Sequence, residues 1–191
     1  MKKHLTTAFL MTIATTILLG VIYPLVITAV AQVLFKDKAN GQIRYRNGEA
    51  IGSRIIGQAF TSPKYFHSRP SAAGNGYDAA NSGGTNLAST NQKLIDRVRS
   101  DVNNLHQENP SQLIPVDMVT TSASGLDPEV SPAAAEFQIP RIAKERGLPE
   151  SAIRDLIEKH TKQRELGLFG EPRVNVLELN LALDDLVPSP K

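Results

Sequence analysis

The feature that most constrains this chain is an uncharged run from Ala8 to Phe35. Roughly 20 apolar residues suffice to cross the hydrocarbon core of a bilayer as a helix. The run is rich in Leu, Ile, Val and Phe, each of which favours insertion by about 0.3 to 0.6 kcal/mol. We therefore predict a transmembrane helix over residues 8–35. The alternative is a cleaved signal peptide, since Ala29-Val30-Ala31 matches the A-x-A cleavage pattern, although the run is longer than the usual ~7–15 residue signal core.

The charges around this run predict its orientation. Lys2 and Lys3 precede it and no acidic residue does. Basic residues stay on the cytoplasmic side, so residues 1–7 are expected to be cytoplasmic and residues 36–191 extracytoplasmic. The chain is then a single-pass protein of the plasma or inner membrane. The formal net charge of +2 comes from these two lysines, and the balanced charge of the outer part gives no electrostatic footprint for nucleic acid.

Small residues recur every fourth position in the apolar run, at Thr12, Thr16, Gly20 and Pro24. These positions lie within about 120° of one helix face, at 100° per residue. Small side chains let a second membrane helix approach closely, so this row is a candidate packing face. The alternative is that such residues are simply common in bacterial spans. Pro24 also removes a hydrogen bond to the Gly20 carbonyl, which predicts a bend.

The outer part is predicted to be one mixed α+β domain, because stretches of both helical and strand character follow one another. Its clearest local signal is Asn47-Gly48, a two-residue hairpin turn between alternating apolar stretches. A loop rich in Gly, Ser and Asn follows over residues 61–90, and Tyr65 and Phe66 are expected to pin its start to the core. The other predicted elements are a helix over 91–108, a strand over 116–121, a helix over 131–146 that Pro140 bends or divides and Gly147 ends, a helix over 149–160, a strand over 174–180 and a short helical tail.

No constellation in the sequence predicts catalysis. There is no cysteine, the four histidines form no ligand pair, and no G-x-S-x-G or phosphate-loop motif is present. The stretch from Val119 to Arg141 is rich in hydroxyls. A hydrolase triad could be assembled from Ser122, Ser124, Asp127 and a distant His160, but only by choosing the residues freely, because no motif joins them. The simpler interpretation is structural: Gly125 supplies a positive φ, Asp127-Pro128 makes a turn, and Ser131 caps the next helix. We therefore assign neither catalytic nor metal-binding residues.

Several stretches together resemble the C subunit of the Kdp-type potassium-transporting P-type ATPase. They are the span with Tyr23-Pro24, IGQAFTSPKYFHSRPSAA, SGGTNLASTN, VTTSASGLDPEVSPAAAEFQIPRIAKERG and GEPRVNVLELNLALD. The resemblance implies a bacterial or archaeal membrane complex with a channel-like potassium subunit, an ATP-hydrolysing subunit and a very small fourth subunit. Within it, this subunit is non-catalytic and needed for assembly and activity. The family is also described as a catalytic chaperone that raises the ATP affinity of the ATPase subunit.

The resemblance also bears on individual residues. A nucleotide-contacting glutamine of the family would fall on Gln163, whereas the residues alone predict an exposed helix end there. ATP is thus expected only through the complex. Candidate residues for a partner surface are Tyr65, Phe66, Arg69, Ser122, Ser124 and Asp127. The competing function is an exported binding module or enzyme, released by cleavage near Ala31.

Overall fold

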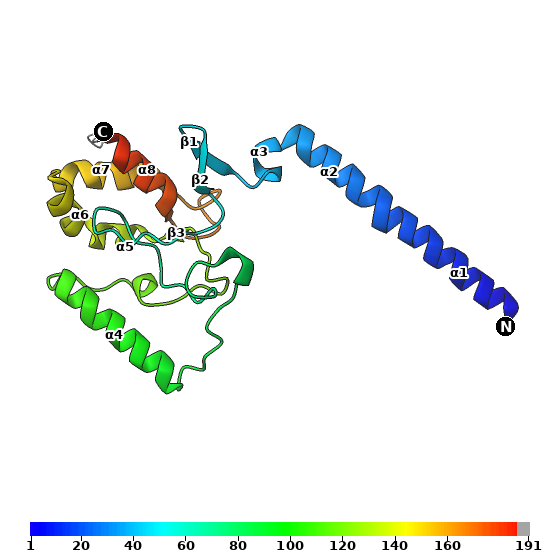
Figure 1. Ribbon diagram of the computed structural model, residues 1–191, viewed down its shortest axis with the longest axis horizontal. Coiled ribbons are helices and arrows are strands. Elements are labelled where there is room, and N and C mark those ends of the chain that lie inside the picture. Colours follow the sequence, from blue (N-terminus) through cyan, green and yellow to red (C-terminus); the bar gives the residue numbers. More distant parts are fainter. Residues whose placement is uncertain (187–191) are drawn as a thin grey trace. The chain divides into compact units, whose positions relative to one another are not determined.

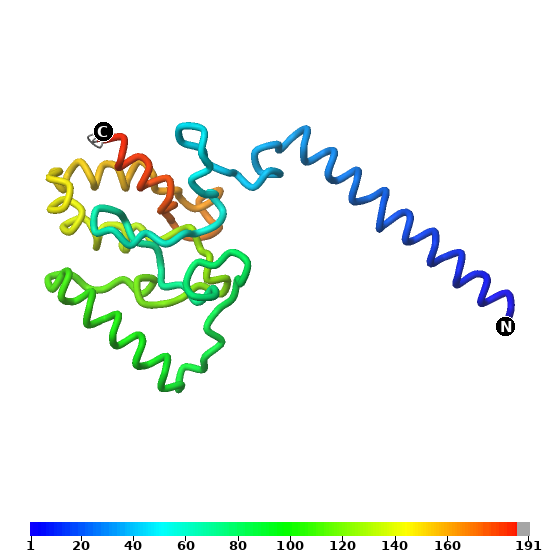
Figure 2. The backbone as a smooth tube through the Cα atoms, in the orientation of Figure 1, coloured from blue at the N-terminus to red at the C-terminus, as the bar shows by residue number. Residues whose placement is uncertain are grey.

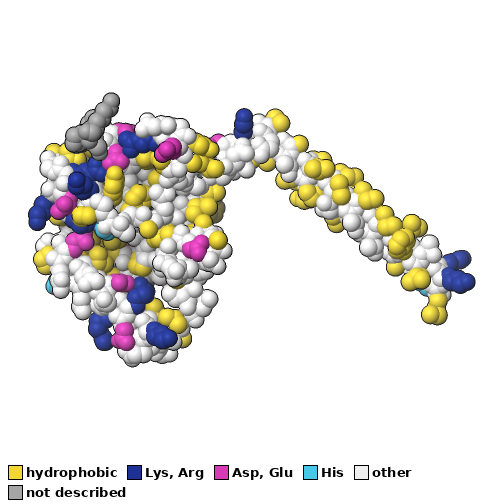
Figure 3. Space-filling view, viewed as in Figure 1, with side chains coloured by type: hydrophobic (Ala, Val, Ile, Leu, Met, Phe, Trp, Pro, Cys, Tyr) yellow, Lys and Arg dark blue, Asp and Glu magenta, His cyan; other side chains and the backbone are white. Residues whose placement is uncertain are grey.

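The computed structural model describes residues 1–186, which fall into two units: Met1–Ala50 and the domain that begins at Ile51. The first unit is dominated by one continuous helix, Lys2–Leu34, of 33 residues and mean hydropathy 2.3. None of its side chains is buried, and Figure 3 shows it covered with hydrophobic side chains up to a basic N-terminal end. It is long and apolar enough to cross a membrane, as predicted, and it begins before Ala8 and ends one residue before Phe35.

The helix has three segments: α1 (Lys2–Ile17), a π-helical turn (Leu18–Ile22) and α2 (Tyr23–Leu34). The wide turn lies where the sequence predicts a weak point, since Pro24 has no N–H to offer the Gly20 carbonyl. The Tyr23 N–H instead bonds back to the Leu18 carbonyl. Thr12 satisfies its hydroxyl within the helix, donating to the Ala8 carbonyl at 2.9 Å. The helix therefore accommodates Pro24 by widening one turn. The predicted bend at Pro24 stays a prediction.

A short helix, α3 (Lys36–Ala39), and a hairpin of β1 (Ile43–Arg46) and β2 (Glu49–Ser53) follow the apolar helix. Asn47 and Gly48 have φ values of 53° and 85°, the left-handed values that a type I′ turn requires at both positions. The predicted hairpin is confirmed.

The domain from Ile51 is α+β, as predicted (Figure 1). A three-stranded antiparallel sheet has the order β3-β5-β4, with Glu129 opposite Asn175 and Thr161 opposite Val174. The sheet is short, and helices provide most of the core. The elements are a 3-10 turn η2 (Ala79–Asn81), α4 (Gln92–Glu108), a 3-10 turn η3 (Val116–Met118), β3 (Glu129–Val130), α5 (Pro132–Phe137), α6 (Ile139–Arg146), α7 (Glu150–His160), β4 (Thr161–Lys162), β5 (Arg173–Asn175) and α8 (Val176–Leu186).

The core is a hydrophobic cluster that the four helices α5 to α8 share with β3, β5, Met118 of η3 and one loop residue, Phe66. The loop over residues 61–90 enters it only at this side chain, which is fully buried. In contrast, α4 contributes no fully buried side chain; its predicted end at Glu108 is confirmed, and it begins at Gln92, after Asn91 as the N-cap. Fully buried aliphatic members of the cluster include Ile139, Ile142, Ile153, Val174, Leu179 and Leu183.

Two predicted strands are wrong. Within residues 116–121, Val116–Met118 form the 3-10 turn η3 and no strand follows, because burial there falls on the consecutive Met118 and Val119 and does not alternate. Residues 174–180 are strand only to Asn175, after which α8 begins. The buried Val176, Leu179 and Leu183 repeat at helical spacing, and the Asn175 side chain accepts the Glu178 N–H at 3.1 Å, starting the helix.

Three local predictions about helix ends are confirmed. The Ser131 hydroxyl accepts the Ala134 N–H at 3.1 Å and caps α5. Pro140 divides the predicted helix, since α5 ends at Phe137 and α6 starts at Ile139. Gly147 ends α6 with φ 65°.

Candidate partner surface at a loop junction and cleft

The hydroxyl-rich stretch is held in place by three other loop segments. The carbonyl of Ser124 accepts the Gly83 N–H at 2.8 Å, and that of Leu126 accepts the Gly57 N–H at 2.8 Å. Between them, the Gly125 carbonyl accepts the Ser71 hydroxyl at 2.6 Å. Gly125 has φ 65°, as its predicted role requires. The stretch is therefore a junction where distant loops meet.

Its side chains are engaged in local contacts that favour the structural interpretation over the hydrolase triad. The Ser122 and Ser124 hydroxyls lie 3.4 Å apart, and Ser124 Oγ also accepts the Leu126 N–H at 3.1 Å. Asp127 accepts the Glu129 N–H at 3.0 Å and pairs with Arg69 at 2.9 Å. Within residues 1–186 no hydrogen bond joins His160 to any of these groups. A base beside a serine, which nucleophilic catalysis needs, is thus not assembled here.

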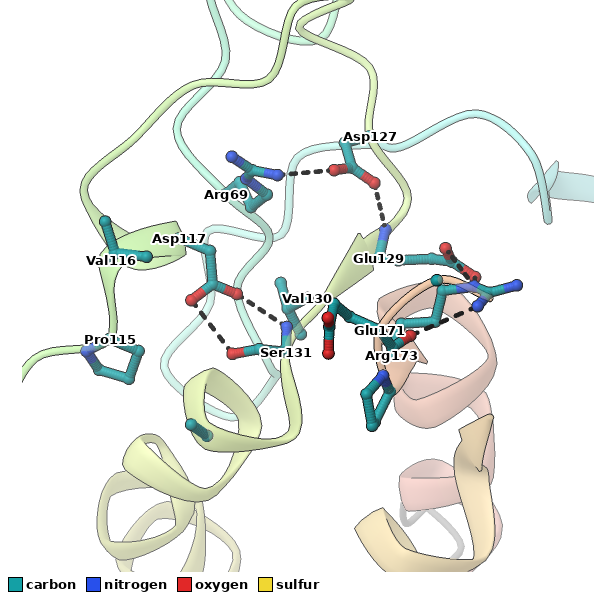
Figure 4. A pocket seen from close by; sticks show the side chains of 13 residues that line it. Arg69, Pro115, Val116, Asp117, Asp127, Glu129, Val130, Ser131, Glu171 and Arg173 are labelled. Carbon is teal, nitrogen blue, oxygen red and sulfur yellow. Dashed lines mark hydrogen bonds and ion pairs between the residues drawn. The ribbon is translucent and has the colours of Figure 1, made fainter. Parts of the chain in front are cut away.

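An open cleft of about 570 Å³ lies beside the junction (Figure 4). It brings together Arg69 and Asp127, both predicted as partner-surface residues, with residues from η3, β3 and β5. The Arg69 guanidinium also reaches the Thr120 hydroxyl at 3.3 Å. The lining residues are Arg69, Pro115, Val116, Asp117, Asp127, Glu129, Val130, Ser131, Ala133, Gly170, Glu171, Pro172 and Arg173.

Asp117, Asp127 and Glu129 in the cleft are each held by a hydrogen-bond donor (Figure 4). Asp117 accepts both the N–H and the hydroxyl of Ser131, at 2.7 and 3.1 Å. Arg173 pairs with Glu129 at 3.0 Å and with Glu165 at 3.4 Å. Each of these carboxylates is held in one orientation by its donor. The arrangement therefore suits a rigid, polar contact surface better than a site of proton transfer. No cluster of three or more His, Asp or Glu that could hold a metal is present among the described residues.

The sequence analysis missed a pair of amide clamps that hold the loop residues Phe66 and His67. The Asn180 side chain accepts the Phe66 N–H at 2.8 Å and donates to the Phe66 carbonyl at 2.9 Å. Gln138 does the same for His67, at 2.7 and 3.2 Å. Both amide side chains are buried, and each mimics one rung of a β-ladder. Figure 2 shows this cyan loop segment passing the green-yellow and red helices that supply them.

Two arginines of α6 complete the hold on this loop. Arg141 donates to the Tyr65 carbonyl at 2.9 Å, and Arg146 to the Lys64 carbonyl at 2.7 Å. Arg146 also lies over the Tyr65 ring, 4.8 Å from its centroid, and the Tyr65 hydroxyl donates to Asp184. No local sequence pattern marks these contacts, because the partners are more than 70 residues apart in the chain.

The other predicted site residues lie apart from the cleft. Phe66 is fully buried, so the expectation that it belongs to a partner surface is wrong; its side chain belongs to the core, as its predicted pinning role requires. Tyr65 is partly buried against Arg146, Ser122 is half-buried, and Ser124 is exposed on the junction. Gln163 is exposed in the loop after β4 and does not line the cleft.

His67 gives the domain a predicted pH response. Burial, reinforced by the positive charge of Arg141, holds the pKa of its imidazole below the ordinary 6.5, and its Nε2 lies 3.0 Å from the Ser62 carbonyl. The unfolded chain takes up this proton near pH 6.5 and the folded domain resists it, so stability should fall as the pH drops below 6.5. Urea unfolding at pH 7.5 and 5.5 checks this. His67→Gln should reduce the difference in the free energy of unfolding between the two pH values. His106→Gln, a change at an exposed position of α4, should leave that difference as in the unchanged protein. The same difference in both variants would contradict the assignment to His67.

Comparison with known proteins decides the family. The family model described as "K+-transporting ATPase, c chain" matches residues 5–185. The chain belongs to this family. It is 67% identical over 190 residues to the potassium-transporting ATPase KdpC subunit of Koribacter versatilis, covering 100% of this chain and 98% of that one. It is 53% identical to the KdpC subunit of Rhodopseudomonas palustris strain BisB18 (96% and 98% covered) and 55% identical to that of Acidobacterium capsulatum (96% and 99% covered).

The resemblance noted in the sequence is thereby confirmed at the level of the family. The KdpC relatives are aligned over nearly their whole length, so the apolar helix and the α+β domain both fall within the shared region.

Proposed function

We propose that this protein is a non-catalytic, membrane-anchored accessory subunit of an ATP-driven potassium-uptake complex. The observation that carries this proposal is the near full-length identity to KdpC subunits of potassium-transporting ATPases. The site geometry supports it, since the hydroxyls and acids of the junction are used in holding loops together. Its partners are the channel-like potassium subunit and the ATP-hydrolysing subunit of the same complex, with a very small fourth subunit beside them.

The proposed topology keeps residues 1–7 in the cytoplasm and the domain outside the plasma or inner membrane. Lys2 and Lys3 at the start of the helix, with no acidic residue before it, support this orientation, whereas Lys36 and Lys38 beyond its end are accompanied by Asp37. From outside, the domain acts mechanically: it stabilises the assembly and biases its conformations, which a subunit can do only through different affinities for the different states.

The proposed membrane contact is the face of Thr12, Thr16, Gly20 and Pro24. The structure leaves space there, because the nearest atom to a Cβ built on Gly20 is Thr16 Cγ2, at 3.9 Å. The Thr12 hydroxyl is already satisfied by its own helix, so a partner helix can pack over Thr12 without leaving that hydroxyl unpaired. A neighbouring helix can therefore come close.

Enlarging this face tests the proposal. The double change Thr16→Leu and Gly20→Leu should reduce co-purification with the channel-like subunit by about tenfold or more, corresponding to at least ~1.4 kcal/mol of lost packing. Ala14→Leu is the control, because Ala14 lies about 160° from Thr16 on the same helix. Quantitative mass spectrometry after detergent extraction gives the ratio of subunits. Equal recovery of the partner with both variants would rule out the packing face.

The effect on ATP affinity that the family resemblance implies is proposed to act through the complex. A domain outside the membrane does not share a compartment with cytoplasmic ATP. Gln163 then contributes no nucleotide contact and serves as part of the exposed loop between β4 and β5. The altered affinity follows from stabilising the conformation of the ATPase subunit that binds ATP best.

A further inference from the structure

The loop between β4 and β5 carries an unusually exposed apolar tip. Leu166, Leu168 and Phe169 are 88%, 77% and 64% exposed. Large apolar side chains grouped in this way on a soluble surface usually mark a contact site. The tip lies outside the core, and the family comparisons give it no role. It is the strongest unexplained feature of the domain.

The tip has a defined shape. Glu165 and Phe169 exchange two backbone hydrogen bonds, N–H to carbonyl, of 2.8 and 2.9 Å. Leu166 and Gly167 turn the chain with φ values of 54° and 73°. The three apolar side chains are thus presented by a closed turn, and little ordering is needed when they are buried.

Two basic residues precede the tip, and each is paired with a glutamate of the same loop. Lys162 pairs with Glu165 at 2.9 Å, and Arg164 pairs with Glu171. These pairs are exposed, with 59% and 45% of the two basic side chains accessible. Exposed ion pairs contribute little to stability, so Lys162 and Arg164 can exchange their carboxylates for phosphate oxygens. Apolar side chains next to basic ones suit the boundary between lipid headgroups and acyl chains, where the apolar groups are buried and the basic groups contact phosphate.

The chain itself brings a bilayer within reach of this domain. Residues 35–42 join the apolar helix to the hairpin, and even fully extended they span no more than about 30 Å. The hairpin then folds the end of β2 back toward the start of β1. Just beyond it, the Arg54 carbonyl accepts the Asn175 side chain at 2.8 Å. Asn175 ends β5, whose first residue, Arg173, joins the loop, so the end of the loop lies a few residues from the Arg54 contact, just after the hairpin.

We propose that Leu166, Leu168 and Phe169 rest in the headgroup–acyl boundary of the bilayer that holds the chain's own helix. This rests on the part of the proposed function in which that helix is retained. The loop would be a second membrane contact that limits rotation of the domain on its short tether. The occupant is lipid, because the tether keeps a bilayer within reach before any partner binds.

The absence of tryptophan from the chain provides a clean test. In the full chain reconstituted alone into nanodiscs, Leu168→Trp should give blue-shifted emission that brominated lipids quench. The control is Leu113→Trp, whose parent side chain is 96% exposed elsewhere in the domain, and it should show neither effect. Adding Leu166→Ser and Phe169→Ser to the Leu168→Trp variant should remove both effects. Phe169→Trp gives a second reporter should the first variant fold poorly.

Two outcomes would overturn the proposal. One is water-like, unquenched emission from both tip variants in nanodiscs. The other is a blue shift that appears only in the assembled complex and is insensitive to brominated lipid, which would assign the tip to a protein partner. Intact mass of the same sample shows whether residues 8–35 are retained, so a failure of the anchor is distinguished from a failure of the tip.

Discussion

Replacing Asn180 by leucine is expected to lower the free energy of unfolding by about 2 to 6 kcal/mol. The change leaves the Phe66 N–H and carbonyl without their partners at a fully buried position. Each unsatisfied buried group costs about 1 to 3 kcal/mol. A typical domain is stable by only about 5 to 15 kcal/mol, so part of the chain should be unfolded at 37 °C.

Urea unfolding of the full chain in detergent, followed by circular dichroism, measures the loss. Asn103→Leu makes the same chemical change at an exposed position of α4, where a shift within about 0.5 kcal/mol is expected. If the two variants lost similar stability, the amide clamp would have no special role. A loss confined to Asn180→Leu would identify it as the device that holds the loop to the core.

The second large effect is expected at Gly125. Gly125 and Gly147 share a φ of 65°, so alanine at either is strained by about 1 to 2 kcal/mol. Only at Gly125 would the new methyl clash, lying 2.6 Å from Ala73 N and 2.7 Å from Gly83 O, whereas at Gly147 nothing lies within 4 Å. Overpacking against backbone adds about 1 to 3 kcal/mol. Gly125→Ala should therefore be the more destabilised variant by that difference.

This pair of glycines separates steric crowding from backbone strain. The same urea titration applies to both variants. Equal losses would mean that the loops around residues 73 and 83 move aside freely, and that the junction is looser than the structure shows. The predicted excess at Gly125 would show that the junction holds these loops in fixed positions, which a partner surface needs.

The features predicted correctly are those encoded by neighbouring residues. The uncharged run, the Asn47-Gly48 turn, the Ser131 cap and the break at Pro140 each depend on a few consecutive positions. The segment from Val174 to Asn180 was mistaken for a strand throughout, because its apolar residues fit both a strand period and a helix period. Burial of Val176, Leu179 and Leu183 in the core favours the helix over the strand.

The site depended on long-range contacts, which a single sequence does not encode visibly. Arg69 and Asp127 were both named as candidates, yet their pairing across 58 residues was not predicted. Asn180 and Gln138 looked like ordinary polar residues of a strand end and a helix. Their roles appear only when the folded loop presents Phe66 and His67 to them. The tip of the β4–β5 loop was likewise missed, because exposure is a property of the fold.

The central claim is that the apolar helix is retained and holds the domain to larger transport machinery. Intact mass spectrometry of the protein purified from its own membranes through a C-terminal tag tests it most directly. The account predicts a chain that still carries residues 8–35, together with a large multispan protein and an ATP-hydrolysing subunit. A chain that begins at Gln32 and is recovered alone would contradict it and would support the exported module.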